Sequence, residues 1–219
     1  MMTNLQKRIL SSVILIPLIM GLIYAGPPYS TSLGIVVTIA LLFEWILMSF
    51  RNRKPSFWGV LIFILGLFYI LGASLLLISL LNISGSNGAI LLLMLLLIVW
   101  ATDTGAYAVG SWLRGPKLAP SISPQKTWSG VLGGIFFGTL LGGAVVHFLG
   151  QTSEWMTFLP MVASISLVGQ LGDLLESTTK RYWRVKDSGA LIPGHGGLLD
   201  RLDSLLGIAF VLAIWQAFM

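Results

Sequence analysis

Residues 56–82 read SFWGVLIFILGLFYILGASLLLISLLN, an uninterrupted apolar stretch without one charged side chain. The hydrocarbon core of a bilayer is about 30 Å thick, and an α-helix crosses it with about 20 apolar residues. Only helices and closed barrels satisfy all their backbone polar groups inside lipid. The stretch therefore predicts a membrane-spanning helix.

The rest of the chain repeats this pattern. Of its 219 residues 56% are hydrophobic and 10% are charged, whereas soluble proteins have about 25% charged residues. A water-soluble domain is thereby excluded. Apolar segments long enough to span a bilayer cover residues 9–26, 31–50, 56–82, 88–107, 128–150, 155–176 and 202–219. We predict an all-α, polytopic integral membrane protein with about seven transmembrane helices, the first of them retained because no cleavage signal follows it.

The placement of lysine and arginine predicts the topology, because these residues accumulate in short cytoplasmic loops. If the amino terminus is cytoplasmic, all 13 basic residues fall on the inner side. The outer loops, 27–30, 83–87 and 151–154, then contain none. We expect a multi-pass protein of the cell (inner) membrane with its working loops in the cytoplasm.

Composition also limits the partners and ligands. The chain has no cysteine, so any metal must be bound by oxygen ligands or by His147 and His195. The formal net charge of +5 comes from short loops between apolar runs. We therefore expect lipid headgroups and phosphates as partners, and no nucleic acid.

Two inner loops, 108–127 and 177–201, exceed the others in size and charge, and both lie in the carboxyl-terminal half. This predicts a transmembrane packing region over 1–99 and a transmembrane catalytic region over 100–219, within one continuous membrane domain. The fifth apolar segment contains glycines at steps of four: Gly130, Gly134, Gly138 and Gly142. Such a stripe allows close approach of another helix, either in the same chain or in a homodimer.

Five carboxylates carry the candidate chemistry, because acids are costly in a membrane and usually mark a function there. They are Asp103, Asp173, Glu176, Asp200 and Asp203. The predicted helices bring all five to the cytoplasmic boundary. For the last two acids, capping of the seventh helix is an alternative explanation.

The pair at the end of the sixth helix needs a positive partner, since a helix dipole disfavours acids there. Lys180 and Arg181 could supply an ion-pair cluster, and a divalent cation is the alternative. Oxygen-only ligands suit Mg²⁺, which commonly binds one or two carboxylates plus substrate phosphates. Phosphates could bind the basic loop and its glycine run Pro193-Gly-His-Gly-Gly197, where backbone N–H groups can turn toward an anion.

These residues lead to a family resemblance. Ser177-Thr-Thr-Lys-Arg181, Lys186-Asp-Ser188 and Pro193-Gly-His-Gly-Gly-Leu-Leu-Asp-Arg-Leu-Asp203 together resemble the signature of the phosphatidate cytidylyltransferases, also known as CDP-diacylglycerol synthases. Residues 103–107, 117–128 and 172–177 resemble earlier blocks of that family. The resemblance covers residues 100–204 and weakens upstream.

The resemblance implies a Mg²⁺-dependent reaction, with or without a second cation, in which CTP and phosphatidic acid give CDP-diacylglycerol and pyrophosphate. The implied metal ligands are Asp173, Asp200 and Asp203, with Asp103 and Glu176 in or beside the coordination shell. The implied catalytic residues are Asp173, Lys180, Arg181, Lys186, Asp200, Arg201 and Asp203. The implied substrate-binding residues are Lys126, Ser177, His195, Gly196 and Gly197.

Other functions stay open at this point. A CTP-dependent lipid kinase or another lipid cytidylyltransferase would use the same chemistry. A cation transporter would explain intramembrane acids, but it should have charge at mid-membrane and an inverted repeat. Only Glu44 lies appreciably inside a predicted span, and no repeat is evident. A CDP-alcohol phosphotransferase would need a spaced Asp, Gly and Arg pattern that the sequence lacks.

Overall fold

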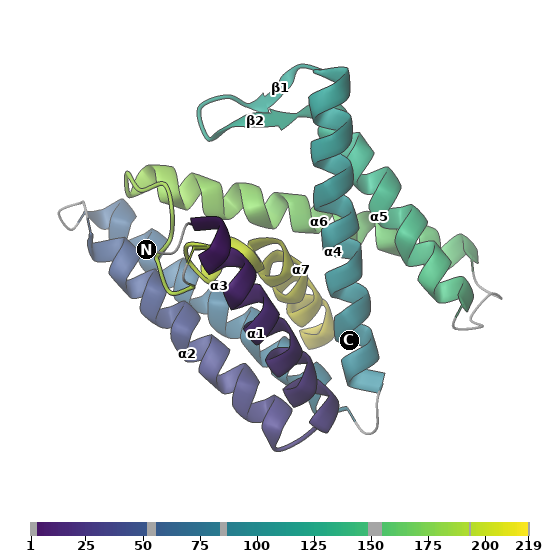
Figure 1. Ribbon diagram of the computed structural model, residues 1–219. Coiled ribbons are helices and arrows are strands. Elements are labelled where there is room, and N and C mark those ends of the chain that lie inside the picture. The colour runs from purple at the N-terminus through teal and green to yellow at the C-terminus, as the bar shows by residue number, and fades with distance from the viewer. Residues whose placement is uncertain (1–3, 52–55, 84–86, 149–154, 193, 219) are drawn as a thin grey trace.

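The computed structural model describes residues 4–51, 56–83, 87–148, 155–192 and 194–218, and Figure 1 shows their arrangement. The elements are α1 (Asn4–Ala25), α2 (Tyr29–Phe50), α3 (Phe57–Leu81), α4 (Asn87–Leu113), β1 (Lys117–Ala119), β2 (Ser123–Thr127), α5 (Trp128–Phe148), α6 (Trp155–Tyr182) and α7 (Leu199–Ala217). The predicted helical class with seven helices is confirmed, with one small antiparallel hairpin added.

Six of the described helices, α1 to α6, are long and apolar enough to cross a membrane. The seventh is not among them, because its first turns carry Asp200, Arg201 and Asp203. A seventh crossing by α7 therefore stays a prediction. Large apolar side chains such as Phe43, Leu75 and Phe136 are more than half exposed on these helices. An apolar surface of this extent indicates contact with lipid.

Four predicted helix ends were wrong by three residues or more, and for one reason. Hydropathy marks where the apolar stretch ends, but backbone hydrogen bonding continues into polar residues. The first helix begins at Asn4, before the predicted residue 9. The fourth helix reaches Leu113 and the sixth reaches Tyr182, while the seventh begins at Leu199. The two inner loops are correspondingly shorter, and the first contains the β1–β2 hairpin. Predicted outer residues 84–86 and 151–154 lie outside the described residues.

The helices form two groups joined by α6. In Figure 1, α4 and α5 stand together below the hairpin, while α1, α2, α3 and α7 gather on the other side and α6 runs between them. The main apolar core is built by α2, α3 and α7 around Ile70, Trp45 and Leu206. A second cluster, which includes Leu95 and Ile208, connects α4 to α7. This packing carries the polar ends of α6 and α7 to one place.

The basic segments lie at the same end of the bundle. Arg8 Nε, in α1, donates to the carbonyl oxygen of Gly194 at 2.6 Å. The Ser56 hydroxyl, just before α3, lies 3.0 Å from the Tyr182 hydroxyl at the end of α6. These segments, which the distribution of basic residues assigned to the cytoplasmic side, therefore lie close to one another in the structure.

The glycine stripe of α5 packs inside the chain. A Cβ placed on Gly130 would lie 2.8 Å from the Ala106 carbonyl oxygen, and one on Gly134 would lie 2.9 Å from the Thr102 carbonyl oxygen. The next two glycines of the stripe meet side chains of α4 and α6. Close packing is therefore the confirmed explanation of the stripe, and a homodimer stays a prediction that this face does not support.

We predict that Gly134→Leu destabilises the protein, because a leucine cannot fit between the α4 and α5 backbones. Overpacking typically costs about 1 to 3 kcal/mol, which should lower the thermal unfolding temperature in detergent. Gly21→Leu is the matched control, since a Cβ on Gly21 would meet nothing within 4 Å. Equal unfolding temperatures for the two variants would contradict the packing account.

Candidate active site

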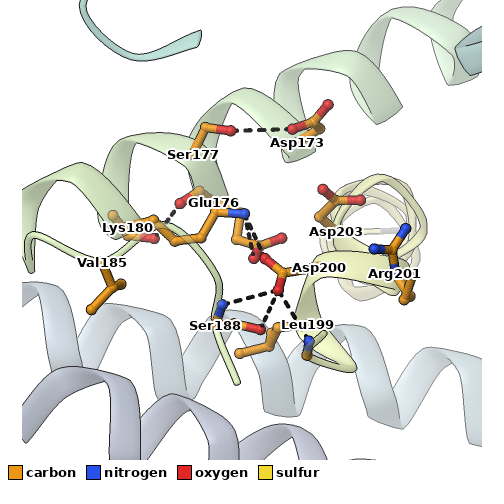
Figure 2. A network of polar contacts seen from close by, with 12 residues as sticks. Asp173, Glu176, Ser177, Lys180, Val185, Ser188, Leu199, Asp200, Arg201 and Asp203 are labelled. Carbon is orange, nitrogen blue, oxygen red and sulfur yellow. Dashed lines mark hydrogen bonds and ion pairs between the residues drawn. The ribbon is translucent and has the colours of Figure 1, made fainter. Parts of the chain in front are cut away.

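A buried lysine joins α6 to α7. Lys180 Nζ lies 2.6 Å from Asp200 Oδ1 and 3.2 Å from Glu176 Oε1, as Figure 2 shows. The lysine side chain is only 12% exposed. An ammonium held this far from water needs negative partners. The lysine and its two carboxylates therefore form one structural unit.

Asp200 also organises the segment that precedes α7. Its Oδ2 accepts hydrogen bonds from the Ser188 N–H at 2.9 Å, the Ser188 hydroxyl at 3.1 Å and the Gly197 N–H at 3.2 Å. Burial opposes its ionisation, but the hydrogen bond and charge of Lys180 together with the Ser188 N–H outweigh burial and hold the pKa of this carboxyl below its ordinary value. Asp200 lies outside the six candidate spans. Its carboxylate is fully engaged by protein groups.

Glu44 of α2 belongs to the same network, although it was not among the predicted site residues. Its Oε2 accepts from the Leu199 N–H at 2.9 Å and from the Ser188 hydroxyl at 3.2 Å. The glutamate thus satisfies a backbone donor in the first turn of α7 from a different helix. Gly189 makes room for it, since a Cβ there would lie 2.6 Å from Glu44 Oε1. The signal that could have found it is an acid well inside an apolar span.

A second lysine ties the hairpin to α6. Lys126 Nζ, on β2, lies 2.7 Å from Asp173 Oδ2. Asp173 Oδ1 accepts a hydrogen bond from the Ser177 hydroxyl at 3.3 Å. Nearby, Arg181 Nε donates to the Ile122 carbonyl oxygen in the hairpin at 3.1 Å. The hairpin is therefore anchored at two points along α6.

The dipole of α6 does not disfavour Asp173 and Glu176, contrary to the prediction. Because α6 continues to Tyr182, Asp173 and Glu176 lie before its last turn, which contains Lys180 and Arg181. The dipole acts mainly within the terminal turn, where this helix has cations. The acids are compensated by lysine contacts instead.

The five predicted carboxylates do converge. Asp203 interacts electrostatically with Asp173 and with Asp103, and it also acts on Glu176. Asp103 is the exposed member on α4. Five acids face two lysines, Lys126 and Lys180, among the described residues. If all five were ionised the cluster would carry an excess of negative charge, which either protons or a bound cation would neutralise.

Glu176 shows most clearly that the cluster is incomplete. It is 6% exposed. Lys180 Nζ lies 3.2 Å from Oε1 and the Asp200 carboxyl is close enough to interact with it, yet neither Glu176 oxygen accepts a well-aligned hydrogen bond among the described residues. Buried oxygens of this kind normally have a partner. A bound cation, a water or a proton shared with Asp200 would satisfy them.

The carboxylate oxygens are the kind of ligand that a hard divalent cation prefers. Their positions, however, do not form a ready coordination shell. The described residues contain no group of three His, Asp or Glu side chains that could already hold one ion. Asp200 is the least available of the predicted ligands, because Lys180, Ser188 and Gly197 occupy it. The remaining oxygen donors match Mg²⁺, which uses few carboxylates and completes its shell with water and substrate phosphates.

The predicted phosphate-binding residues are dispersed. Arg201 donates through Nε and Nη2 to the His195 carbonyl oxygen, and Figure 2 shows it on the side of Asp200 away from Lys180. Lys186 is exposed at an open cavity of about 1120 Å³ between the end of α2 and residues 184–191. Gly196 has a positive φ of 89°, which glycine adopts without strain.

The structure thus separates two sets of predicted residues. The central cluster contains Asp103, Lys126, Asp173, Glu176, Ser177, Lys180, Asp200 and Asp203. Around it lie Arg181, Lys186, His195, Gly196, Gly197 and Arg201. The Gly197 N–H, expected to face a substrate phosphate, donates to the Asp200 carboxylate of α7.

Comparisons with known proteins cover this region. A family model described as the Cytidylyltransferase family matches residues 47–219. A phosphatidate cytidylyltransferase of Brucella suis biovar 1 is 34% identical over 259 aligned positions, which cover 99% of this chain and 94% of that protein. The protein of the same description from Staphylococcus aureus (strain COL) is 45% identical over 129 residues, covering 59% of this chain and 50% of the relative.

We predict that Lys180→Met strongly destabilises the protein, because two buried carboxylates lose their cation. Removing one partner of a buried ion pair costs about 3 to 5 kcal/mol, measurable by unfolding in detergent. Adding Asp200→Asn should recover part of this loss. The control is Lys117→Met at an exposed lysine of β1. Equal stability of the Lys180 and Lys117 variants would contradict the role of the buried lysine.

Proposed function

The chain belongs to the cytidylyltransferase family, and from this membership we propose its reaction. The protein transfers CMP from CTP to phosphatidic acid in the membrane, giving CDP-diacylglycerol and pyrophosphate. The observation that carries the proposal is the family match over residues 47–219, which includes all the acids and lysines of the central cluster.

The chemistry of this reaction suits a site of fixed charges. An oxygen of the lipid phosphate forms a bond to the α-phosphorus of CTP, while the bond from that phosphorus to the β-phosphate oxygen breaks and pyrophosphate leaves. The nucleophile is already an anion, so the work is positioning and charge stabilisation. Lys126 and Lys180 are held in place by carboxylates. We propose that they contact phosphate oxygens of the substrates.

We propose Mg²⁺ as the cofactor. Asp173, Glu176 and Asp203 would hold it together with substrate phosphates, because their oxygens are less fully occupied than those of Asp200. The ion would supply positive charge to the phosphates during transfer. Asp200 would instead keep Lys180 and the Ser188 segment in position. The negative excess of the cluster is compatible with a second cation.

The lipid substrate would approach from the side of α2. Phe43 and Leu47 are more than half exposed beside the open cavity, which Arg51 and Lys186 also line. The cavity therefore lies between an apolar surface, which could contact acyl chains, and basic side chains. We propose that it faces the cytoplasm, where CTP and the lipid phosphate can meet.

The enzymatic proposal predicts loss of turnover in carboxylate variants that remain folded. Asp173→Asn and Asp203→Asn should each lower CDP-lipid formation by on the order of 100-fold or more, the scale of losing an electrostatic contact in a transition state. The assay uses purified protein, labelled CTP, phosphatidic acid and a Mg²⁺ titration, with both products identified.

The control for that assay is Glu154→Gln, at an acid predicted in an outer loop that lies outside the described residues. It should leave the rate unchanged. Release of CDP in place of pyrophosphate would identify a lipid kinase instead. Wild-type rates in both aspartate variants would remove these acids from the mechanism.

The topology is tested by single cysteines, because the chain has none of its own. Ser121→Cys lies in the exposed turn of the hairpin, and Tyr29→Cys lies exposed in the predicted outer loop 27–30. An impermeant maleimide added to intact cells should label the Tyr29 variant and spare the Ser121 variant. The reverse pattern would place the active site outside.

A further inference from the structure

The amino-terminal helix makes polar contacts that lipid anchoring does not require. Only 6% of the apolar window of α1 is buried in the protein, and this helix packs mainly along α2. Its first turns nevertheless contact the loop before α7. Arg8 Nε donates to the Gly194 carbonyl oxygen at 2.6 Å. Figure 1 shows the start of α1 beside the loop that leads into α7.

The contacts converge on His195. Its Nδ1 lies 3.1 Å from the Ser11 hydroxyl, and its Nε2 lies 3.5 Å from the Ser12 hydroxyl. Its backbone N–H donates to the Ile192 carbonyl oxygen at 2.9 Å. Its carbonyl oxygen accepts from Arg201 Nη2 at 2.6 Å and from Nε at 3.1 Å. The ring is therefore held by α1 and the backbone by the loop and α7.

The loop around this histidine needs external support. Gly194 and Gly196 have φ values of 79° and 89°, and glycine loses much conformational freedom when fixed in this way. The Ser11 hydroxyl donates to the Arg8 carbonyl oxygen at 3.0 Å, so toward the ring it acts as an acceptor for Nδ1–H. The Ser12 hydroxyl can then donate to Nε2, and the two serines together fit the imidazole with its hydrogen on Nδ1.

We propose that Arg8, Ser11 and Ser12 are positioning residues of the active site, through which α1 fixes the orientation of His195 and the adjoining glycine loop for phosphate binding. The loop continues into the central cluster, because the Gly197 N–H donates to Asp200 and Asp200 holds Lys180. The effect on catalysis rests on the proposed function, whereas the physical coupling of α1 to the loop does not.

The test compares three variants of the full-length protein. Ser11→Ala/Ser12→Ala removes both hydroxyls, and Ser11→Thr/Ser12→Thr restores them. Ser32→Ala is the control, since the Ser32 hydroxyl bonds the Pro28 carbonyl oxygen in its own segment. For each protein we would measure kcat and KM for CTP and for phosphatidic acid, thermal unfolding, and hydrogen exchange of residues 194–197 relative to the β1–β2 hairpin.

The alanine pair should lower kcat/KM about tenfold, the scale of losing two modest hydrogen bonds. Exchange of the loop should rise while exchange of the hairpin and the unfolding temperature stay near wild type. The threonine pair should recover most of the activity. Unchanged loop exchange, or an activity loss that threonine does not rescue, would overturn the proposal.

The two proposals fail in different ways. If wild-type protein makes no CDP-diacylglycerol, the proposed function is wrong, and the exchange measurement still decides whether α1 holds the loop. If wild-type protein is active and the alanine pair matches it in both kcat/KM and loop exchange, only the positioning role is wrong.

Discussion

The site depends on keeping one ammonium in a place where water is scarce. Lys180 is stable there because Asp200 and Glu176 approach it from two helices, and these acids are tolerable there because of the lysine. The same contact ties α6 to α7, and through Asp200 it reaches the Ser188 segment. The ion pairs that neutralise Lys180 therefore also hold the two helices together.

Residues from the first half of the chain also support the segment around the ion pairs. Glu44 belongs to the region predicted for packing, yet it accepts from Leu199 and Ser188 next to the carboxylate cluster. Trp45, its neighbour, packs edge to face on Trp183 at the end of α6. The first half of the chain thus shapes the loop on which the second half relies. The division near residue 100 describes where the chemistry-bearing residues lie, whereas their support comes from both halves.

Much of this could be predicted, because lipid imposes strong constraints on sequence. Apolar length predicts the helices, and the cost of a buried acid marks the carboxylates. The rest depends on tertiary contacts that local sequence does not encode. The ends of α4 and α6 extend past the apolar stretch. The partner that Glu44 finds is 155 positions away, and Arg201 turns to the His195 carbonyl oxygen although its charge suggests a phosphate.

The two anchors of the hairpin are chemically unequal. Arg181 holds it through a backbone carbonyl oxygen, whereas Lys126 holds it through a carboxylate and the Gln170 carbonyl oxygen. Under the proposed function, a substrate phosphate near Lys126 would be a second anion for the ammonium that Asp173 already neutralises. The anchor at Lys126 would then depend on the charges around it, whereas the anchor that Arg181 makes to the Ile122 carbonyl oxygen would not.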